Sequence, residues 1–281
     1  AAPGRFVRPA GLDFRRGDLL VRAGDRLDAR RLALAAAAGQ ARLPLRRRPR
    51  VAILATGDEL VRPGETPGPD QIVASNPYAL QAIVERAGGE VFDLGIARDS
   101  FDDLRRAFGE ARAAQADLLV TLGGASVGDH DLVQPALLRE GLELGFWRVA
   151  LRPGKPLMHG RLGRTVLIGL PGNPVSSIVC AILFVVPAIR ALLGDPDAGE
   201  DPAEFGRLGA ALAGNDNRQD YMRAALGRSP GGELLATPFP RQDSSMLSVL
   251  AASEALVVRA PHAPAAEAGE PCRIIRLDRF C

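Results

Sequence analysis

Residues 51–60 read Val-Ala-Ile-Leu-Ala-Thr-Gly-Asp-Glu-Leu, and this stretch decides the fold expected for the chain. The aliphatic run at residues 51–54 is typical of a strand buried on both faces, as in a parallel sheet. The Thr-Gly-Asp-Glu that follows puts hydroxyl, backbone and carboxylate groups at the carboxyl end of that strand. Ligands of open α/β sheets bind at this edge. The stretch therefore predicts a strand that leads into a binding loop.

The same alternation of strand and helix continues through the middle of the chain. Further strands are predicted at residues 91–94, 118–122, 147–151 and 165–169, and helices at residues 77–87, 101–114, 132–139 and 175–193. Aliphatic strands that alternate with helices at this spacing indicate a mostly parallel sheet with helices on both faces. We therefore expect a three-layer α/β/α domain over residues 49–195.

The two flanking segments have a different pattern. Residues 1–48 predict short strands at residues 6–8 and 19–21 and a helix at 28–38, a β-rich segment too short to bury a core alone, so we expect it to pack on something else. After residue 195, short strands alternate with Gly, Pro and Asp turns, which predicts a small all-β sandwich or barrel over residues 196–281. The abrupt start of the chain also indicates a fragment that lacks an earlier part.

Composition narrows the class of protein. The 281 residues are 47% hydrophobic and 24% charged, which is typical of a soluble globular protein with room for two domains. Residues 1–50 carry 13 arginines against four aspartates, and such a segment can bind nucleic acid. Because the arginines of residues 15–31 are interleaved with aspartates and lack aromatic stacking residues, we expect a solvated or partner-facing surface and no nucleic acid.

The cysteines and the apolar segments indicate the compartment. Cys180, Cys272 and Cys281 are odd in number and widely spaced, without a C-x-x-C pair, so neither a disulfide framework nor a zinc site is expected. The longest apolar run, residues 178–189, is too short to cross a bilayer, and no signal peptide opens the chain. We therefore predict a cytoplasmic protein with no membrane contact.

Lys155 is the only lysine, and the other 34 basic residues are arginines. In so arginine-rich a chain, a remaining lysine indicates a position that needs a compact, flexible ammonium group. It lies in the turn Arg152-Pro153-Gly154-Lys155-Pro156, and the similar turn Gly169-Leu170-Pro171-Gly172-Asn173-Pro174 follows. With Arg148 nearby, these residues predict an anion-binding site.

Two further loops contribute groups of other kinds. Thr56-Gly57 and Gly123-Gly124-Ala125-Ser126 offer backbone N–H groups and short hydroxyls beside a helix start, which suits a phosphate. Carboxylates also follow the strands, and beside a phosphate such groups bind Mg²⁺, position a polar ligand or transfer protons. The acidic residues are Asp58, Glu59, Asp99, Asp129 and Asp131.

Each of these signals has a plainer explanation when taken alone. A Gly-Gly loop is often only a turn, Asp129 and Asp131 suit helix caps, and Pro171 and Pro174 suit the end of a strand and the start of a helix. No G-x-G-x-x-G fingerprint opens a helix in this sequence. Gly154-Lys155 is not part of a P-loop either, because Pro follows it. The functional interpretation depends on the joint occurrence of four such loops in this order along the chain.

That ordered set closely resembles the molybdopterin molybdenumtransferase family, of the MoeA type, to which the E domain of gephyrin is related. The matching motifs are Thr-Gly-Asp-Glu-Leu at 56–60, Gly-Gly-Ala-Ser-Val-Gly-Asp at 123–129, Arg-Pro-Gly-Lys-Pro at 152–156 and Gly-Leu-Pro-Gly-Asn-Pro-Val-Ser at 169–176. The resemblance makes residues 1–48 the returning half of an elongated first domain, 49–195 the molybdopterin-binding domain and 196–281 the C-terminal β-domain. The family's N-terminal stretch and its inserted second domain are missing, and Ala125 replaces the usual valine.

The resemblance implies molybdenum insertion during molybdenum cofactor synthesis. Adenylylated molybdopterin would be hydrolysed with release of AMP, while molybdate joins the dithiolene sulfurs. Its implied catalytic residues are Asp58, Glu59, Asp99, Asp131 and Lys155, with Glu59 and Asp99 as ligands of Mg²⁺. Its implied substrate-binding residues are Thr56, Gly57, Gly123, Gly124, Ser126, Gly128, Arg148, Arg152, Pro171, Gly172, Asn173, Pro174 and Ser176.

Within that resemblance, Lys155, Arg152 and Arg148 would attract molybdate and phosphate oxygens, and residues 171–174 would form a rigid wall. The implied partners are a second copy in a homodimer and a molybdopterin adenylyltransferase as the preceding enzyme. Three other possibilities stay open. The chain could be a molybdopterin adenylyltransferase on the same core, a non-catalytic gephyrin-like scaffold, or an inactive fragment, because in the family a segment that this chain lacks completes the cleft across a homodimer.

Overall fold

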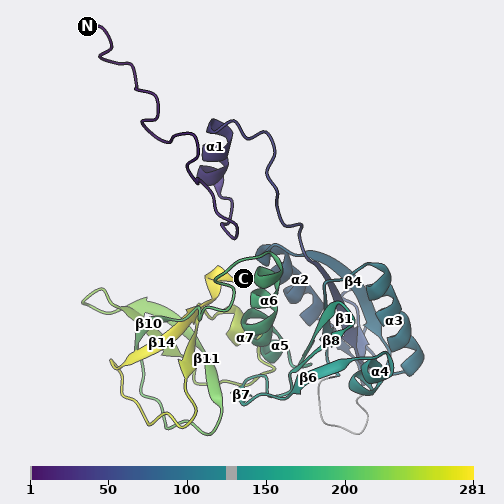
Figure 1. Ribbon diagram of the computed structural model, residues 1–281. Coiled ribbons are helices and arrows are strands. Elements are labelled where there is room, and N and C mark those ends of the chain that lie inside the picture. The colour runs from purple at the N-terminus through teal and green to yellow at the C-terminus, as the bar shows by residue number, and fades with distance from the viewer. Residues whose placement is uncertain (1, 125–131) are drawn as a thin grey trace.

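The computed structural model describes residues 2–124 and 132–281, which form an α/β domain, a β-domain packed beside it and an N-terminal arm (Figure 1). The main sheet has the strand order β4-β1-β5-β9-β8-β6. Four neighbouring strands are parallel: β4 (Glu90–Ala97), β1 (Arg50–Thr56), β5 (Leu118–Leu122) and β9 (Thr165–Leu170). The mostly parallel α/β fold expected from the sequence is confirmed.

The far edge of the sheet differs from the expectation. The strand predicted at residues 147–151 is replaced by β6 (Glu143–Trp147), which ends where that prediction began, and by the separate β7 (Leu151–Arg152). The strand β8 (Met158–Leu162) was not predicted at all, and it pairs antiparallel with β9 and β6. Its sequence, Met-His-Gly-Arg-Leu, has no aliphatic run, because this strand, which lies between β9 and the edge strand β6, is only partly buried.

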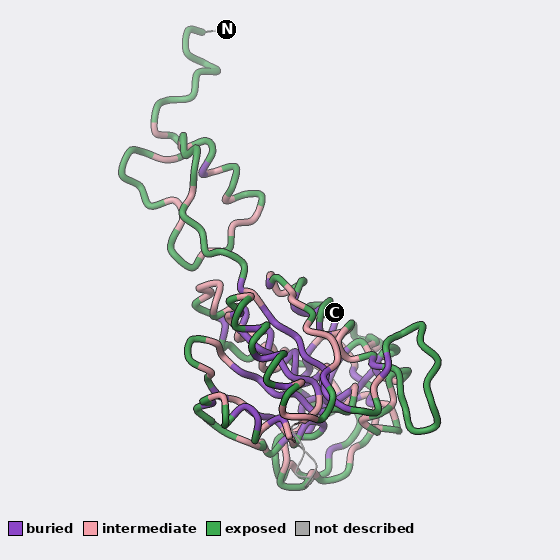
Figure 2. Tube along the Cα trace, turned by 90° about the vertical axis from the view of Figure 1, so that its right-hand side faces the viewer, coloured by how far each residue is buried: buried purple, intermediate pink, exposed green. Residues whose placement is uncertain are grey.

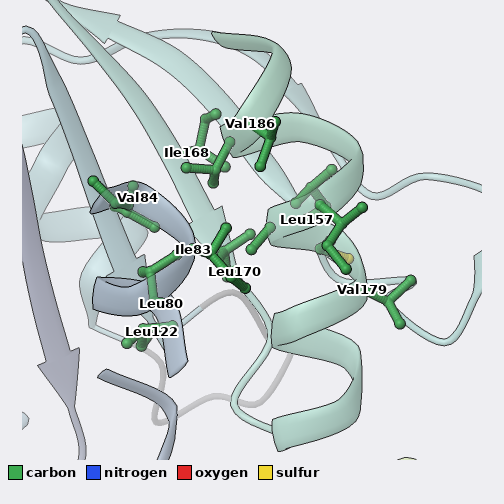
Figure 3. Packing of buried hydrophobic residues seen from close by; sticks show 14 of the residues in the cluster. Leu80, Ile83, Val84, Leu122, Leu157, Ile168, Leu170, Val179 and Val186 are labelled. Atoms are coloured by element: carbon green, nitrogen blue, oxygen red, sulfur yellow. The ribbon is translucent and has the colours of Figure 1, made fainter. Parts of the chain in front are cut away.

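Helices cover both faces of this sheet. On one face lie α2 (Asn76–Ala87), α5 (Pro174–Cys180) and α6 (Val186–Leu192), and on the other lie α3 (Phe101–Ala113) and α4 (Val133–Arg139). Strand β1 alternates between the two cores: Val51 and Ile53 face the first group of helices, whereas Ala52 and Leu54 face the second. Figure 3 shows the first core, where Leu80 and Ile83 of α2 meet the sheet near Leu170. The continuous aliphatic strands arise because both faces are buried.

The helix predicted at residues 175–193 forms as one long helix with a π-helical turn, Ala181–Val185, between α5 and α6. Pro187 lacks an N–H group and would clash with the carbonyl one turn earlier in a regular α-helix, and a π turn relieves such a clash. Within the described residues, Pro174–Leu192 is the one helix long and apolar enough to cross a membrane, by length and composition only. It is 61% buried inside the protein, as a core helix is.

The C-terminal region is a small barrel. Its strands are β10 (Glu204–Leu208), β11 (Gln219–Arg228), β12 (Leu234–Pro238), β13 (Ala255–Arg259) and β14 (Pro271–Arg276), with the short helix α7 (Leu247–Ala251) and a 3₁₀ turn (Leu277–Arg279). Strand β12 pairs with both β10 and β11 and so closes the ring. Closure removes the open edges that a sandwich would leave.

The two domains share hydrogen bonds as well as a core. Strand β7 belongs to the chain of the α/β domain, yet it pairs with β11 of the barrel through Leu151–Gln219 and Arg152–Asp220. Tyr221 and Leu256 of the barrel pack into the same hydrophobic core as the long helix. The turn that carries Lys155 therefore lies directly at the domain junction.

The N-terminal arm does not contain the predicted strands. Residues 6–8 and 19–21 lie in turns and irregular chain, and only the helix α1 (Ala29–Ala37) forms, so the β-rich expectation for residues 1–48 was wrong over residues 2–48. Ala35 is the one buried residue of the arm, which is almost entirely exposed in Figure 2. The predicted strands have no partner strand to pair with. Another pair of strands that the sequence did not predict, β2 (Leu60–Val61) and β3 (Ile72–Val73), follows the first motif loop.

Candidate functional site

Three of the motif loops meet at the carboxyl edge of neighbouring strands. The loops follow β1, β5 and β9, and the Gly123 amide donates a hydrogen bond to the Leu170 carbonyl at 3.1 Å. Gly123 has φ +92°, and a Cβ there would lie 2.9 Å from the Thr56 carbonyl oxygen. Gly172 is a neighbour of Gly123, since a Cβ on it would lie in ordinary contact with the Gly123 Cα, at 3.9 Å. At Gly123 the absence of a side chain lets the loop backbones after β1 and β5 approach each other.

The loop at residues 171–176 is held from two sides. The Asn76 side-chain amide donates to the Gly172 carbonyl at 2.7 Å, and the Asn173 side-chain amide donates to Ser244 Oγ at 3.1 Å. The Val175 amide donates to the Ser244 carbonyl at 3.1 Å. Because Ser244 belongs to the barrel, both domains shape this wall, and Pro171 and Ser176 are buried within it.

Carboxylates line the side of the site next to β1. Asp58 and Glu59 are exposed, and the Asp99 amide donates to Asp58 Oδ1 at 3.3 Å, which brings two of the predicted acidic residues together. A cleft of about 560 Å³ opens beside Asp58 and Asp99, and its other polar lining residues include Ser100, Glu65 and the two arginines Arg62 and Arg98. The Glu59 carboxylate lies against Gly57, where a Cβ would overlap it.

The same cleft offers few of the side chains that bind metal ions. Across residues 2–124 and 132–281, no group of three or more His, Cys, Asp or Glu side chains has the spacing of a metal centre. Mg²⁺ usually needs only one or two carboxylates, because waters and substrate phosphates supply the other ligands. Asp58 and Asp99 beside an open cleft fit that requirement.

The predicted cations lie in different surroundings. Lys155 is exposed and makes no ion pair with any described residue, while the Val149 amide donates to its backbone carbonyl at 3.1 Å. Arg148 is exposed, with φ +77° and its guanidinium 4.5 Å from the centre of the Trp147 ring. Both cations are thus available to an anion as far as the described part of the chain is concerned.

Arg152 is already engaged. Its Nε donates to Asp220 Oδ1 at 2.6 Å, its Nη2 donates to Asp220 Oδ2, and its Nη1 lies 3.3 Å from Asp216 Oδ2. The hydrogen bonds that Arg152 donates to Asp220 raise the pKa of Arg152 above its ordinary value. The structure thus directs this guanidinium into the barrel, and sequence reasoning had not anticipated that partner.

Two family models match the chain in the order of its domains. One, described as a probable molybdopterin binding domain, matches residues 52–191, and the other, described as the MoeA C-terminal region (domain IV), matches residues 206–277. The molybdopterin molybdenumtransferase of Haemophilus influenzae is 32% identical over 273 residues, which cover 97% of this chain and 67% of that protein. The chain belongs to the molybdopterin molybdenumtransferase family.

Further relatives agree with that assignment. The molybdopterin molybdenumtransferase of a Nostoc species is 37% identical over 80% of this chain and 52% of its own length. A crystal structure of a molybdopterin biosynthesis MoeA protein from Pyrococcus horikoshii superposes with a TM-score of 0.78 at 29% identity, over 95% of this chain and 64% of that one. The chain thus spans between about half and two thirds of the length of these relatives.

Some family motif residues lie outside the described part of the chain. Ser126, Gly128 and Asp131 fall within residues 125–131, so their predicted roles stay predictions. Sequence reasoning missed Asn76, Ser244 and Asp220. Asp220 carried a usable signal: a carboxylate inside the strand Gln-Asp-Tyr-Met needs a cation once it is buried.

Proposed function

We propose that this chain catalyses molybdenum insertion into adenylylated molybdopterin, with release of AMP. The observation that carries the proposal is the convergence of three glycine-rich loops at one sheet edge, with exposed carboxylates at the β1 side. The turn that bears Lys155 packs against the third of these loops, since a Cβ on Gly154 would lie 3.8 Å from the Ser176 carbonyl oxygen. Backbone amides there suit a phosphate, and a free ammonium suits a tetrahedral oxyanion.

The residues divide into tasks. Lys155 and Arg148 attract molybdate and phosphate oxygens, because neither is neutralised by a described carboxylate. The backbones of Thr56, Gly57, Gly123 and Gly124, together with Ser126, Gly128 and Asp131, hold the pterin and its phosphate. The wall of Pro171, Gly172, Asn173, Pro174 and Ser176 excludes water and fixes the angle at which the dithiolene enters.

The carboxylates would hold Mg²⁺. Asp58, Glu59 and Asp99 line or border the cleft beside β1, and they are the residues that would bind the ion. Bound there, Mg²⁺ would neutralise the charge that develops on the pyrophosphate oxygens as AMP leaves. Asp58 and Glu59, being exposed, also orient the attacking water or oxyanion.

The setting of the reaction belongs to the same proposal. The domain limits are 1–48, 49–195 and 196–281, the compartment is the cytoplasm, and a molybdopterin adenylyltransferase supplies the substrate. The exposed apolar residues of the arm, such as Phe6 and Leu19, suit a surface that a second copy covers in a homodimer. A second copy would bury apolar surface of the arm that the single chain leaves exposed.

The test measures AMP release from adenylylated molybdopterin on addition of molybdate. We expect Lys155→Ala to reduce the rate by about 10²-fold, as loss of one charged donor at a reacting oxyanion does. Arg164→Ala is the matched control, because Arg164 is an exposed cation in the turn between β8 and β9, at the opposite edge of the sheet. Equal rates in the two variants would refute the assignment of Lys155.

The same assay separates the rival functions. Synthesis of the adenylyl adduct from ATP and molybdopterin, without hydrolysis on adding molybdate, would establish an adenylyltransferase instead. Absence of molybdopterin binding in calorimetry, with capture of a peptide partner, would establish a scaffold. Activity that appears only when the additional segments of a longer relative are joined to this chain would show that the chain needs those segments.

A further inference from the structure

The turn that presents Lys155 is clamped from three directions. Strand β7, just before it, pairs with β11, where the Gln219 amide donates to the Ala150 carbonyl at 2.9 Å. Gly154, with φ +114°, lies against the long helix so closely that a Cβ would overlap Cys180 Sγ. The Lys155 carbonyl accepts from the Val149 amide, which closes the turn on itself. The backbone under the ammonium is therefore fixed, although the ammonium itself is exposed.

One side chain of the barrel adds a further contact, to the first residue of this turn. Asp220 is 6% exposed, and both of its carboxylate oxygens accept from the Arg152 guanidinium. Such two-point pairing fixes the direction of an arginine as well as its position. Because the buried carboxylate cannot be hydrated, Arg152 cannot leave it at low cost.

Two more residues of the barrel help to hold the Arg152 guanidinium in place. Asn215 Oδ1 accepts from Arg152 Nη2 at 3.2 Å, and the Asn215 amide in turn donates to the carbonyls of Arg218 and Ala260 at 2.7 and 2.8 Å. Asp216 also faces the guanidinium and is itself paired with Arg218 Nη2 at 2.7 Å. These contacts all come from the barrel, which supplies no motif of its own.

We propose that Asp220 is a positioning residue for the oxyanion site: through Arg152 it holds the Lys155 turn in the geometry that binds molybdate. Through this pair the barrel domain acts on the oxyanion site of the α/β domain, in addition to shaping the wall at residues 171–176 through Ser244. The inference rests on the proposed function, because it takes Lys155 as the oxyanion ligand. It also changes the role of Arg152, from a direct ligand of the anion to the link between the two domains.

Charge and position predict opposite results for Asp220→Asn, and this makes the test decisive. Removal of a carboxylate near an anion site raises the local positive potential, and it frees Arg152 to bind the anion, so electrostatics alone would strengthen oxyanion binding. Loss of positioning would weaken it. We expect the dissociation constant for molybdate, measured by calorimetry on the full chain, to rise by about tenfold, because the Lys155 turn would no longer hold the ammonium group in place.

Two companion variants keep the result interpretable. Asp220→Glu retains the charge and the two acceptor oxygens and should recover part of the affinity. Asp220→Asn combined with Arg152→Gln leaves no buried charge unpaired, so it keeps the junction folded, and it should still bind molybdate about tenfold more weakly because the turn is released. Thermal unfolding of each variant reports on the junction separately from the affinity.

The outcomes are distinct. If the parent chain binds molybdate, Lys155→Ala loses binding, and Asp220→Asn and the double variant bind weakly, the inference stands. If Lys155→Ala loses binding but Asp220→Asn and the double variant bind as tightly as the parent or more tightly, Asp220 has only a structural or electrostatic effect, and the inference is overturned while the proposed function survives. If Lys155→Ala binds molybdate as the parent chain does, the proposed site itself is wrong, and the inference falls with it.

Discussion

The helices α1 and α2 show that a good local signal and a place in the core are separate properties. Helix α1 begins at an N-cap, Asp28, whose side chain accepts from the Arg31 amide, yet it buries only Ala35. Helix α2 has no side-chain cap hydrogen bond, yet it buries Leu80, Ile83 and Val84 against the sheet. A cap lowers the cost of starting a helix, but only a second surface makes burial possible.

The largest expected difference between the arm and the α/β domain is in proteolysis. Trypsin should cut after the arginines of residues 5–48 at least about 10³-fold faster than within residues 50–195, because opening the arm breaks almost no buried contacts. A time course read by mass spectrometry measures both rates. These rates apply to dilute protein, in which the chain is a monomer, and protection of the arm that grows with protein concentration would show its burial in the proposed homodimer. Protection of the arm already in dilute protein would contradict an arm that is free in the single chain.

A matched pair of leucines extends the comparison to stability. Leu80→Ala should lower the free energy of unfolding by about 2–5 kcal/mol, since Leu80 is buried in the core of α2 and the sheet. Leu12→Ala should change it by less than about 0.5 kcal/mol, because that side chain is 65% exposed. Denaturant unfolding gives both values. Similar losses in the two variants would mean that the arm packs on the body.

Two glycines with positive φ separate backbone strain from packing. Gly39 has φ +80° and no atom within 4 Å of an added Cβ, whereas a Cβ on Gly154 would also lie 2.8 Å from Leu151 Cδ1. Gly154→Ala should therefore cost about 2–3 kcal/mol of stability, with a backbone part of about 1 kcal/mol. Gly39→Ala should carry the backbone part alone and shorten α1 without shifting the main unfolding transition. Circular dichroism during denaturation distinguishes the two results.

The smallest effect is expected from two carboxylates with similar contacts. Asp28 accepts from Arg30 and the Arg31 amide, and Asp117 accepts from Arg47 and the Arg50 amide. Burial raises the pKa of Asp117, but these hydrogen bonds outweigh it and leave the pKa below its ordinary value. Asp117→Asn should cost the α/β domain about 0.5–1 kcal/mol at neutral pH.

The pH dependence of that cost follows from the direction of the shift. Because the folded pKa of Asp117 is lowered, its stabilisation is complete above pH of about 4, the unfolded value, and disappears as pH falls through the folded pKa. Unfolding of the parent chain and of Asp117→Asn should therefore converge in acid. Asp28→Ala, its control in the arm, should leave the main transition unchanged at every pH, and a shift there would show that α1 is coupled to the domain.

Much of the fold followed from local pattern. Strand β5 forms at residues 118–122, where the sequence predicts it, because a strand buried on both faces is mostly aliphatic. The barrel strand β13 at residues 255–259 is equally direct. Strand β8 was missed because its short sequence has no aliphatic run, although Met158 and Gly160 are buried and alternate with the polar His159 and Arg161. The predicted N-terminal strands did not form, because pairing partners cannot be seen in one segment.

By itself, the sequence determined the family, the alternation of strands and helices in the α/β domain and the set of polar loops that end the strands. These properties depend on neighbouring residues along the chain, so a pattern of a few positions is enough to indicate them. Only the tertiary structure decided which groups meet. Gly123 touches the backbone of Thr56, Asn173 meets Ser244, and Arg152 turns to Asp220, 68 positions away. Such contacts depend on how the sheet and the barrel pack in space, and the separation of two residues along the chain does not show whether they meet.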